Sequence, residues 1–387
     1  MNSKQFETAK MCLKVVTPVN ISDGIVLGAK DYLYDSRRQK VYFLNMHQWH
    51  MFIYKHMLLE KYESYLANFR DKQSLLEWLQ MQGYDIDDVR TVITSEAQAT
   101  VNLMDNEKKK TLNDINRHIQ QPDGSLYVPG SSIKGVFRTA ILYSLLQKRQ
   151  DIKVKYWRQI QEKISSNYFK PYRDFNKLIS DLENELLHTL RLVDGNIHSN
   201  NAVCSAMRGL QVSDTYASRN MQTAILQKVD GGFDKFGKAS PKKLPIFREC
   251  MLPEAELFFD VKIEKAVMST IGINTVDDLL KATHSFFAAV TDLLQQAFEK
   301  EYQEAFQGVA AGNMFLGGNT GFLIKTLLAM LAPDKDIAKN TIKVLLDKSF
   351  KTHKHLLRDK VIAPRTLKCT NYNGKLMLMG VAEVRKV

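Results

Sequence analysis

The chain has 387 residues, of which 44% are hydrophobic and 25% are charged, and this balance predicts a large core in two domains or in one heavily elaborated domain. No apolar run reaches about 18 residues, which argues against a membrane-spanning helix. Lysine and arginine outnumber aspartate and glutamate by 54 to 42, and between Lys339 and Val387 twelve residues are basic and three are acidic. This concentration indicates either a surface for an anionic partner, such as nucleic acid, or a solvated helix face.

The four cysteines lie too far apart in the sequence for a zinc motif, and they are Cys12, Cys204, Cys250 and Cys369. The first residues also lack the pattern of a signal peptide. We therefore expect reduced, buried thiols in a cytoplasmic protein, with neither a metal nor a cofactor.

The first half of the chain combines short strands with long helical segments. Residues 10–17 and 41–44 predict strands, whereas apolar residues recur at helical spacing from 47 to about 118 and from 150 to 191. We expect both helical segments to be insertions. Aromatic and basic residues interleave in the second, which suits either RNA binding or an amphipathic helix with an aromatic core face.

Strands follow at 210–213, 223–229 and 255–263. The segment 230–245 between the last two is rich in glycine, proline and lysine and predicts a loop. Its phenylalanines could stack on bases while its lysines neutralise phosphates, and a plain surface loop is the alternative. The residues concerned are Phe233, Lys235, Phe236, Lys238, Lys242 and Lys243.

The last part of the chain predicts a long helix from 275 to about 306 and a glycine-rich loop from 312 to 321. Two further helices are expected up to about residue 357. Terminal strands are expected at 366–371 and 376–384.

The stretch 126–139, LYVPGSSIKGVFRT, joins a short expected strand to an amphipathic helix through a Pro-Gly turn. Unpaired N–H groups at a helix start attract anions, and Lys134 and Arg138 lie one turn apart, so we expect a phosphodiester to bind here. An ordinary helix start capped by a serine is the alternative. A nucleotide-binding P-loop is excluded, because its second glycine would be followed by lysine and not by Val136. The residues expected to contact phosphates are Gly130, Ser131, Ser132, Lys134, Gly135 and Arg138.

This stretch resembles the signature segment of the RAMP superfamily of CRISPR-associated RNA-binding proteins. Three more segments are similar to the family in the expected order: 17–24 (TPVNISDG), the glycine-rich loop in 313–325 (NMFLGGNTGFLIK) and 364–368 (PRTLK). The last resembles the ending of the fifth subunit of type III-A Csm complexes. The chain departs from the family at Asn20, where histidine is usual.

The strand and helix pattern and this resemblance both point to an α+β fold. The expected core is ferredoxin-like, of the RNA-recognition type, with large helical insertions, and forms one RAMP core or two RAMP-like halves. We place a boundary near residue 250, between a domain at 1–250 and a domain at 251–387 that holds the glycine-rich loop and the basic tail. Further RNA contacts are expected at Lys235, Lys238, Gly317, Gly318, Asn319, Gly321, Lys325, Arg365 and Lys368.

The resemblance implies a non-catalytic crRNA-binding subunit that caps the 3′-end side of a type III-A effector complex and contributes to crRNA maturation and antiviral defence. Its expected partners are crRNA, other Csm subunits, especially the neighbouring backbone subunit, and crRNA-trimming nucleases. The alternative is a RAMP endoribonuclease acting on precursor crRNA. His353 and His355 are the candidate bases, but on a helix they would point to different faces.

Overall fold

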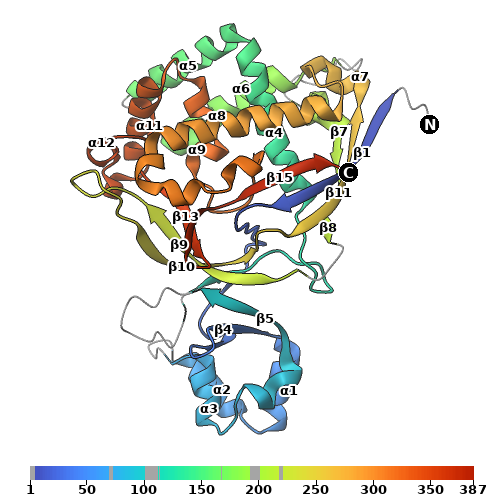
Figure 1. The fold of residues 1–387 in the computed structure, drawn as a ribbon, viewed down its shortest axis with the longest axis vertical. Helices are drawn as coiled ribbons and strands as arrows, with labels where there is room; N and C mark the ends of the chain where they lie inside the picture. The colour runs from blue at the N-terminus through green and yellow to red at the C-terminus, as the bar shows by residue number, and fades with distance from the viewer. Residues whose placement is uncertain are drawn as a thin grey trace.

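We analysed a computed structural model of the chain, which describes residues 5–68, 73–100, 112, 114–166, 168–191, 201–217 and 221–387. These residues form two β-sheets and several groups of helices (Figure 1). The expected α+β class is confirmed. No helix in these ranges is long and apolar enough to cross a membrane.

The first sheet has the strand order β12-β15-β1-β11-β7, with β8 paired to β11, and every pairing within it is antiparallel. Along the chain, helix α4 lies between strands β1 and β7 of this sheet, and helix α8 lies between β11 and β12. The strand bounds are β1 Phe6–Val15, β7 Leu210–Val212, β8 Tyr216–Ala217, β11 Glu256–Glu264, β12 Met314–Phe315 and β15 Val381–Lys386.

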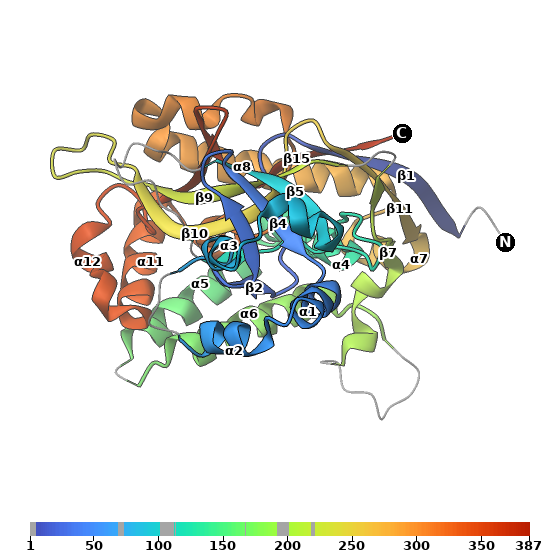
Figure 2. The ribbon, with the colours of Figure 1, turned by 90° about the horizontal axis from the view of Figure 1, so that it is seen from below.

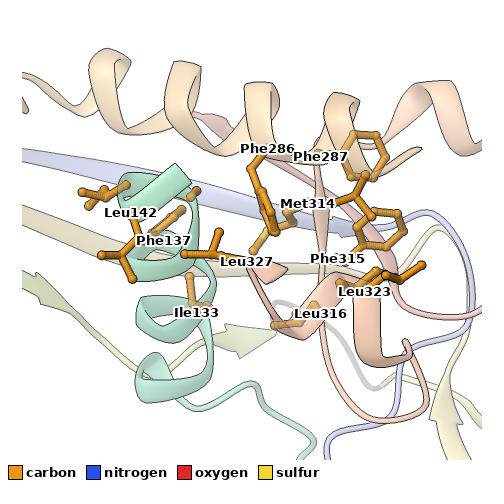
Figure 3. Packing of buried hydrophobic residues seen from close by; sticks show 14 of the residues in the cluster. Ile133, Phe137, Leu142, Phe286, Phe287, Met314, Phe315, Leu316, Leu323 and Leu327 are labelled. Atoms are coloured by element: carbon orange, nitrogen blue, oxygen red, sulfur yellow. The ribbon is translucent and has the colours of Figure 1, made fainter. Parts of the chain in front are cut away.

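Alternating side chains of β1 point into the main core, where α4 (Gly130–Lys148) and α8 (Val276–Tyr302) cover one face of the first sheet. Figure 3 shows Ile133 and Phe137 of α4 facing Leu327, while Phe286 and Phe287 of α8 reach toward β12. Thr275 begins α8 with a capping box that includes Asp278, so the helix start is defined locally. The core therefore ties segments from both ends of the chain together.

The second sheet has the order β2-β6-β10-β9-β5-β4-β3, and β13 joins β9 to β14. Both sheets contain strands from before and after residue 250, so the boundary expected there does not coincide with the division between the sheets. The bounds are β2 Val26–Leu27, β3 Tyr32–Asp35, β4 Lys40–Leu44, β5 Ile93–Thr100, β6 Ile115–Asn116, β9 Thr223–Gly231, β10 Lys242–Met251, β13 Leu367–Tyr372 and β14 Lys375–Leu378.

A lobe made of β4, β5 and three short helices projects from one end of the molecule (Figure 1). Trp49, Ile53 and Trp78 pack with Tyr42 into a separate small core. The expectation of a helical insertion from 47 to 118 is correct only for its first part, because β5 and β6 follow the helices. β5 alternates small buried residues with exposed polar ones, which suits a strand between β4 and β9. The helices are α1 Met46–Lys55, α2 Leu59–Ala67 and α3 Leu75–Met81.

The second expected insertion, 150–191, does form helices, and these lie next to the helices near the end of the chain (Figure 2). The expected strand at 126–128 is absent, since only Leu126 makes an isolated bridge, to Gln120. The remaining α-helices are α5 Gln150–Ser165, α6 Pro171–Leu187, α7 Lys265–Met268, α9 Phe322–Lys325, α10 Leu328–Leu331, α11 Lys335–Ser349 and α12 His355–Arg358. Short 3₁₀ helices lie at Ile86–Val92, Ala202–Cys204, Ala206–Gly209, Ser269–Ile271, Gln303–Phe306, Val309–Ala311 and Lys351–His353.

Candidate nucleic-acid interface

The glycine-rich loop packs against the segment that follows β1. Gly317 has a φ of +89°, and a Cβ atom there would lie 2.3 Å from the carbonyl oxygen of Asn20. The same oxygen accepts a hydrogen bond of 2.7 Å from the N–H of Gly318. Only glycine satisfies both the left-handed conformation and the close approach at residue 317, so this loop is fixed by contacts within the chain.

Asn20 is fully buried and joins the glycine-rich loop, through its backbone carbonyl, to β10, through its side chain. Its Oδ1 accepts a hydrogen bond of 2.9 Å from Nη1 of Arg248, and its Nδ2 donates one of 2.7 Å to the carbonyl oxygen of Glu249. A neutral amide can serve as donor and acceptor at once. Asn20 therefore orients a guanidinium group beside the glycines without neutralising its charge.

Three strands and a short helix gather four cations near the glycine-rich loop. Arg248 of β10 lies opposite Leu226 of β9, and Lys368 of β13 lies opposite Asp230, so their side chains share one face of the second sheet with that of Lys228. Lys325 ends helix α9. We refer to Lys228, Arg248, Lys325 and Lys368 as the cation cluster.

One carboxylate, that of Asp230, balances two members of the cation cluster. It lies 2.9 Å from Nζ of Lys368 and 3.8 Å from Nζ of Lys228. Across the ranges that the structure describes, Arg248 and Lys325 form no ion pair. The four cations and Asp230 together therefore carry a net charge of +3 next to the glycine-rich loop.

Burial lowers the pKa values of Lys228, Arg248 and Lys325, and neighbouring positive charges add to the effect at the two lysines. Burial lowers the pKa of Lys228, and the neighbouring charges of Lys368 and Arg248 lower it further. Burial followed by the charge of Arg248 likewise lowers the pKa of Lys325, and burial lowers that of Arg248 itself. An anion placed among them would reverse these shifts, because opposite charge favours the protonated form of a base.

Two buried donors at this place have no acceptor among the described residues: Nε of Arg248 and Nδ2 of Asn319. Asn319 stands at φ +62° directly after the two glycines, in a conformation that asparagine tolerates better than most residues. Unpaired buried donors are uncommon in folded proteins. A phosphate oxygen offers both the acceptor and the negative charge that the cluster lacks.

The structure thus brings together six of the residues expected from the sequence, and adds two that sequence reasoning missed, Lys228 and Arg248. Gly321 has a φ of +103°, and a Cβ atom there would lie 3.2 Å from Cγ of Lys368. A charged residue inside a mostly apolar strand was the available signal for the two that were missed. The six expected residues are Gly317, Gly318, Asn319, Gly321, Lys325 and Lys368.

The turn at the start of α4 makes internal contacts. The N–H of Gly130 donates a 2.7 Å hydrogen bond to Oδ1 of Asp214, and a Cβ at this glycine would lie 2.3 Å from the carbonyl oxygen of Val212. The expectation that Ser131 or Ser132 caps the helix is wrong, because the helix begins at Gly130 and Pro129 precedes it. The carboxylate of Asp214, which follows β7, therefore accepts a hydrogen bond at the helix start in place of a serine side chain.

Lys134 donates a hydrogen bond of 2.6 Å to the carbonyl oxygen of Leu210, and partial burial lowers its pKa. Arg138, one turn further, is half exposed and lies 3.6 Å from Glu183. Open space surrounds the Cα of Gly135. Of the residues expected to contact phosphate on α4, Ser131 and Arg138 are exposed and Gly135 is partly exposed.

The segment expected as a loop at 230–245 is a β-hairpin whose tip lies on the same side of the molecule as α12 (Figures 1 and 2). Lys242 and Lys243 belong to β10, so the loop is shorter than expected. Oδ1 of Asp234 accepts hydrogen bonds from the N–H groups of Phe236 and Lys238 and so shapes the tip.

The two phenylalanines of the hairpin have different surroundings. Phe233 stacks on Phe298 of α8 with ring centroids 5.4 Å apart, which fastens the hairpin to the core. Phe236 is 76% exposed, and the ammonium of Lys235 lies 4.8 Å from its ring centre. Only Phe236 is therefore free to stack on a base, with Lys235 and the exposed Lys238 beside it.

Arg365 and His355 share a buried carboxylate. Nη1 of Arg365 lies 2.7 Å from Oδ1 of Asp359, and Nδ1 of His355 lies 2.8 Å from Oδ2 of the same residue. Asp359 is fully buried, so Arg365 balances an internal charge. His353 is exposed and lies in a separate 3₁₀ turn, and Lys354, in the left-handed conformation, stands between the two histidines.

All four cysteines are buried, as expected. Within the described ranges, no group of three or more histidine, cysteine, aspartate or glutamate side chains could hold a metal ion.

Comparison with known proteins extends over nearly the whole chain. The chain is 27% identical to the CRISPR system Cms protein Csm5 of Mycobacterium tuberculosis, over 98% of this chain and 97% of that protein. It is 22% identical to the proteins of the same name from Enterococcus italicus, over 88% and 85% of the two chains, and Streptococcus thermophilus, over 83% and 80%.

Two solved structures share the fold. A chain in the cryo-EM structure of a Csm-crRNA-target RNA ternary complex of a type III-A CRISPR-Cas system matches with a TM-score of 0.65 and 18% identity, covering 98% of this chain and 100% of that chain. The crystal structure of T. onnurineus Csm5 matches with a TM-score of 0.60 and 17% identity, covering 96% and 99%. The model of the RAMP superfamily matches residues 12–322, which is well over half of the sequence, and the chain therefore belongs to the RAMP superfamily.

Proposed function

We propose that this protein is a non-catalytic crRNA-binding subunit of a type III-A CRISPR effector complex, in which it caps the 3′-end side of the crRNA and contributes to crRNA maturation and antiviral defence. The observation that carries the proposal is the cation cluster, where four cations face one carboxylate and two buried donors lack acceptors. The relatives named Csm5 support the assignment to such a complex. Its partners would be crRNA, the neighbouring backbone subunit, other Csm subunits and crRNA-trimming nucleases.

The chemistry of the cluster suits the RNA backbone. Lysine and arginine neutralise phosphates, and such contacts fix the position of a nucleic acid without reading its sequence. The hairpin tip and the exposed part of α4 offer further contacts, through Phe236 with Lys235 and Lys238, and through Gly135 with Arg138. A stacked base and neutralised phosphates together are typical of single-stranded RNA binding.

We also assign the first sheet to a single ferredoxin-like core. The order β1-α4-β7-β11-α8-β15 is a β-α-β-β-α-β sequence, and its strands lie side by side as β15-β1-β11-β7. This arrangement is the split β-α-β pattern. The core draws strands from both sides of residue 250, so in this proposal the sheets, and not the sequence halves, are the structural units.

Two histidines, His353 and His355, are the candidate general bases, and their surroundings do not suit catalysis. His355 is buried against Asp359 and Arg365, where no 2′-hydroxyl can reach it. His353 is exposed, but its ring stacks on Phe350 at 5.7 Å, and among the described residues no carboxylate is bonded to it. A general base is normally within hydrogen-bond reach of the proton it removes and is held by a partner. Neither histidine meets both conditions.

RNA binding is the first test of this function. The double variant Arg248→Gln with Lys325→Gln should weaken binding of a fluorescein-labelled mixed-sequence single-stranded RNA about tenfold or more in anisotropy titrations, because two phosphate contacts are lost. The control Arg158→Gln with Lys335→Gln removes the same charge from two exposed, ion-paired sites and should have little effect. Equal weakening by both double variants would contradict a defined site.

The catalytic alternative is tested separately with precursor crRNA. Purified protein at saturating concentration should leave the RNA intact, with and without chelator. If the wild type cleaved the RNA and His353→Ala slowed cleavage about 100-fold or more at unchanged affinity, the protein would be an endoribonuclease.

A further inference from the structure

We infer that residues 350–361, together with a neighbouring apolar groove, form a docking surface for an acidic polypeptide segment that carries a bulky apolar anchor residue. We call residues 350–361 the C-terminal knob. It contains the 3₁₀ turn Lys351–His353 and helix α12, and it lies at the edge of the molecule (Figure 1).

The charge of the C-terminal knob is unbalanced. Its exposed cations form no ion pair within the described ranges, and they are Lys351, Lys354, Arg358 and Lys360. The one carboxylate of the knob, Asp359, is buried and bonded to Arg365 and His355. The exposed side chains of the knob therefore carry a charge of +4 beside one carboxylate, that of Asp347, which accepts a 3.2 Å hydrogen bond from the N–H of Leu356. The remaining positive charge attracts an acidic partner.

The same knob exposes large apolar side chains. Leu357 is 73% exposed, and Phe350, Leu356 and Val361 are each about half exposed. Several exposed apolar side chains close together are characteristic of an interaction site, whereas isolated ones are ordinary. Apolar and basic residues thus occupy one short segment.

An apolar groove begins at Val361. It has a volume of about 190 Å³ and lies between α8, α9, α11 and the end of the C-terminal knob. Its apolar lining includes Leu293, Ala297, Leu323, Ala338, Ile342 and Val361. This space suits one bulky apolar side chain, the kind of buried anchor that dominates the binding energy of many interfaces.

Lys335 and Lys339 at the rim of the groove are paired with carboxylates, so they add no unbalanced positive charge. Lys335 is bonded to Asp292 at 3.1 Å and Lys339 to Asp336 at 2.7 Å. The unbalanced charge therefore lies on one side of the groove, on the knob. This asymmetry predicts a partner segment in which the acidic residues stand to one side of the apolar anchor.

The chemistry of the exposed residues favours a polypeptide over RNA. Three of the four exposed apolar residues are aliphatic and offer no ring for a base to stack on, and the fourth, Phe350, already stacks on His353. Single-stranded nucleic acid is bound through aromatic platforms beside cations. Leucine and valine beside a groove match apolar side chains of a protein instead.

The test is site-specific photo-crosslinking in the assembled complex, and it rests on the proposed function, because the partner is expected to be a subunit or an associated protein of that complex. Leu357→p-benzoylphenylalanine places the crosslinker on the knob, and the complex is purified through a tag on this chain. Mass spectrometry of the crosslinked product should identify a segment with net negative charge and a bulky apolar residue.

A charge-reversal pair provides the control. Lys354→Glu with Arg358→Glu should lower the crosslink yield roughly tenfold, as expected for two ion pairs lost at an interface. Arg158→Glu with Lys163→Glu makes the same charge change on α5 and should leave the yield unchanged.

Any of four results would overturn the inference: crosslinks to RNA alone, no crosslinked polypeptide, a neutral or basic partner segment, or a yield unchanged by the charge reversal at Lys354 and Arg358. Failure of the tagged wild-type chain to purify with any complex would count against the proposed function instead, so the two failures are distinguishable.

Discussion

Asn20 shows how a single buried amide can organise a site whose parts are far apart in the sequence. It bonds to Arg248 and to the backbone of Glu249, about 230 residues later in the chain, and to Gly318 still further along. The sequence indicated that this position departs from the family pattern, but it contained no sign of these partners. Such contacts depend on the register of β10 and on the path of the glycine-rich loop, which local residue preferences do not determine.

Two glycines with similar expected roles should respond in opposite ways to alanine. Gly317→Ala should lower the free energy of unfolding by about 2 kcal/mol or more, because φ is +89° and the new Cβ meets the Asn20 carbonyl oxygen. Gly135→Ala should raise it by about 0.5–1 kcal/mol, since Gly135 lies inside α4 with open space around it. Urea denaturation measures both.

RNA affinity adds a second readout to this pair. If RNA approaches the backbone at Gly135, the alanine variant should be more stable and yet bind RNA more weakly. Unchanged affinity in a stabilised variant would remove Gly135 from the binding surface.

Lys134 and Arg138 lie one turn apart on α4, yet the structure assigns them different tasks. Lys134→Met should lower stability by about 1–2 kcal/mol, because the bond to the Leu210 carbonyl is lost. Arg138→Met should change stability by less than about 0.5 kcal/mol, since its pairing with Glu183 is long and half exposed. Denaturation curves of the two variants check this order, and a more stable Lys134 variant would contradict it.

At the scale of elements, the two phenylalanines of the hairpin between β9 and β10 have different roles: Phe233 packs the hairpin against the core, and Phe236 is expected to stack on an RNA base. Phe236→Ala should leave stability unchanged and weaken RNA binding by about 1–3 kcal/mol, the usual effect of losing a stacked base. Phe233→Ala should instead lower stability by about 1–3 kcal/mol, because it loses packing on Phe298 and Tyr302. Thermal unfolding and anisotropy titrations distinguish the two, and an RNA defect in the Phe233 variant alone would reverse the assignment.

Elements with a strong local pattern could be predicted from the sequence, and those fixed by distant partners could not. The helices α4 and α8 and the strands β9 and β11 match their expected positions within a few residues. β5 was taken for helix, because its alternation is carried by the small residues Ala97 and Ala99, whose apolar signal is weak. The expected final strand is two strands, since Gly380, at φ +84°, turns the chain between them.

At the scale of the whole molecule, the excess positive charge should make RNA binding depend on salt. The logarithm of the association constant should fall with the logarithm of salt concentration by about 0.7 per phosphate contacted on a single strand. Removing Arg248 and Lys325 should therefore reduce the slope by about 1.4. Titrations from low to physiological salt measure this, and a slope near zero in the wild type would argue against phosphate binding.

The excess of basic residues between Lys339 and Val387 is evident from the sequence, but these residues do not form one surface patch. Arg365 balances buried Asp359, Lys368 belongs to the cation cluster, and Arg385 pairs with Glu256 in the first sheet. Four other cations form the surface of the C-terminal knob. Charge composition therefore predicts an anionic partner, whereas the distribution of the charge follows from the pairing of distant strands.

The pairing of β1 with β15 has a consequence for synthesis on the ribosome. Oγ1 of Thr17 accepts a hydrogen bond from the N–H of Val381, 364 residues later, and the cation cluster needs Lys368. The emerging polypeptide therefore carries β1 with one edge unpaired until nearly all of these residues have been translated. A truncated translation product that ends before Lys368 would lack the closing strands and one member of the cation cluster, so it could not complete this sheet.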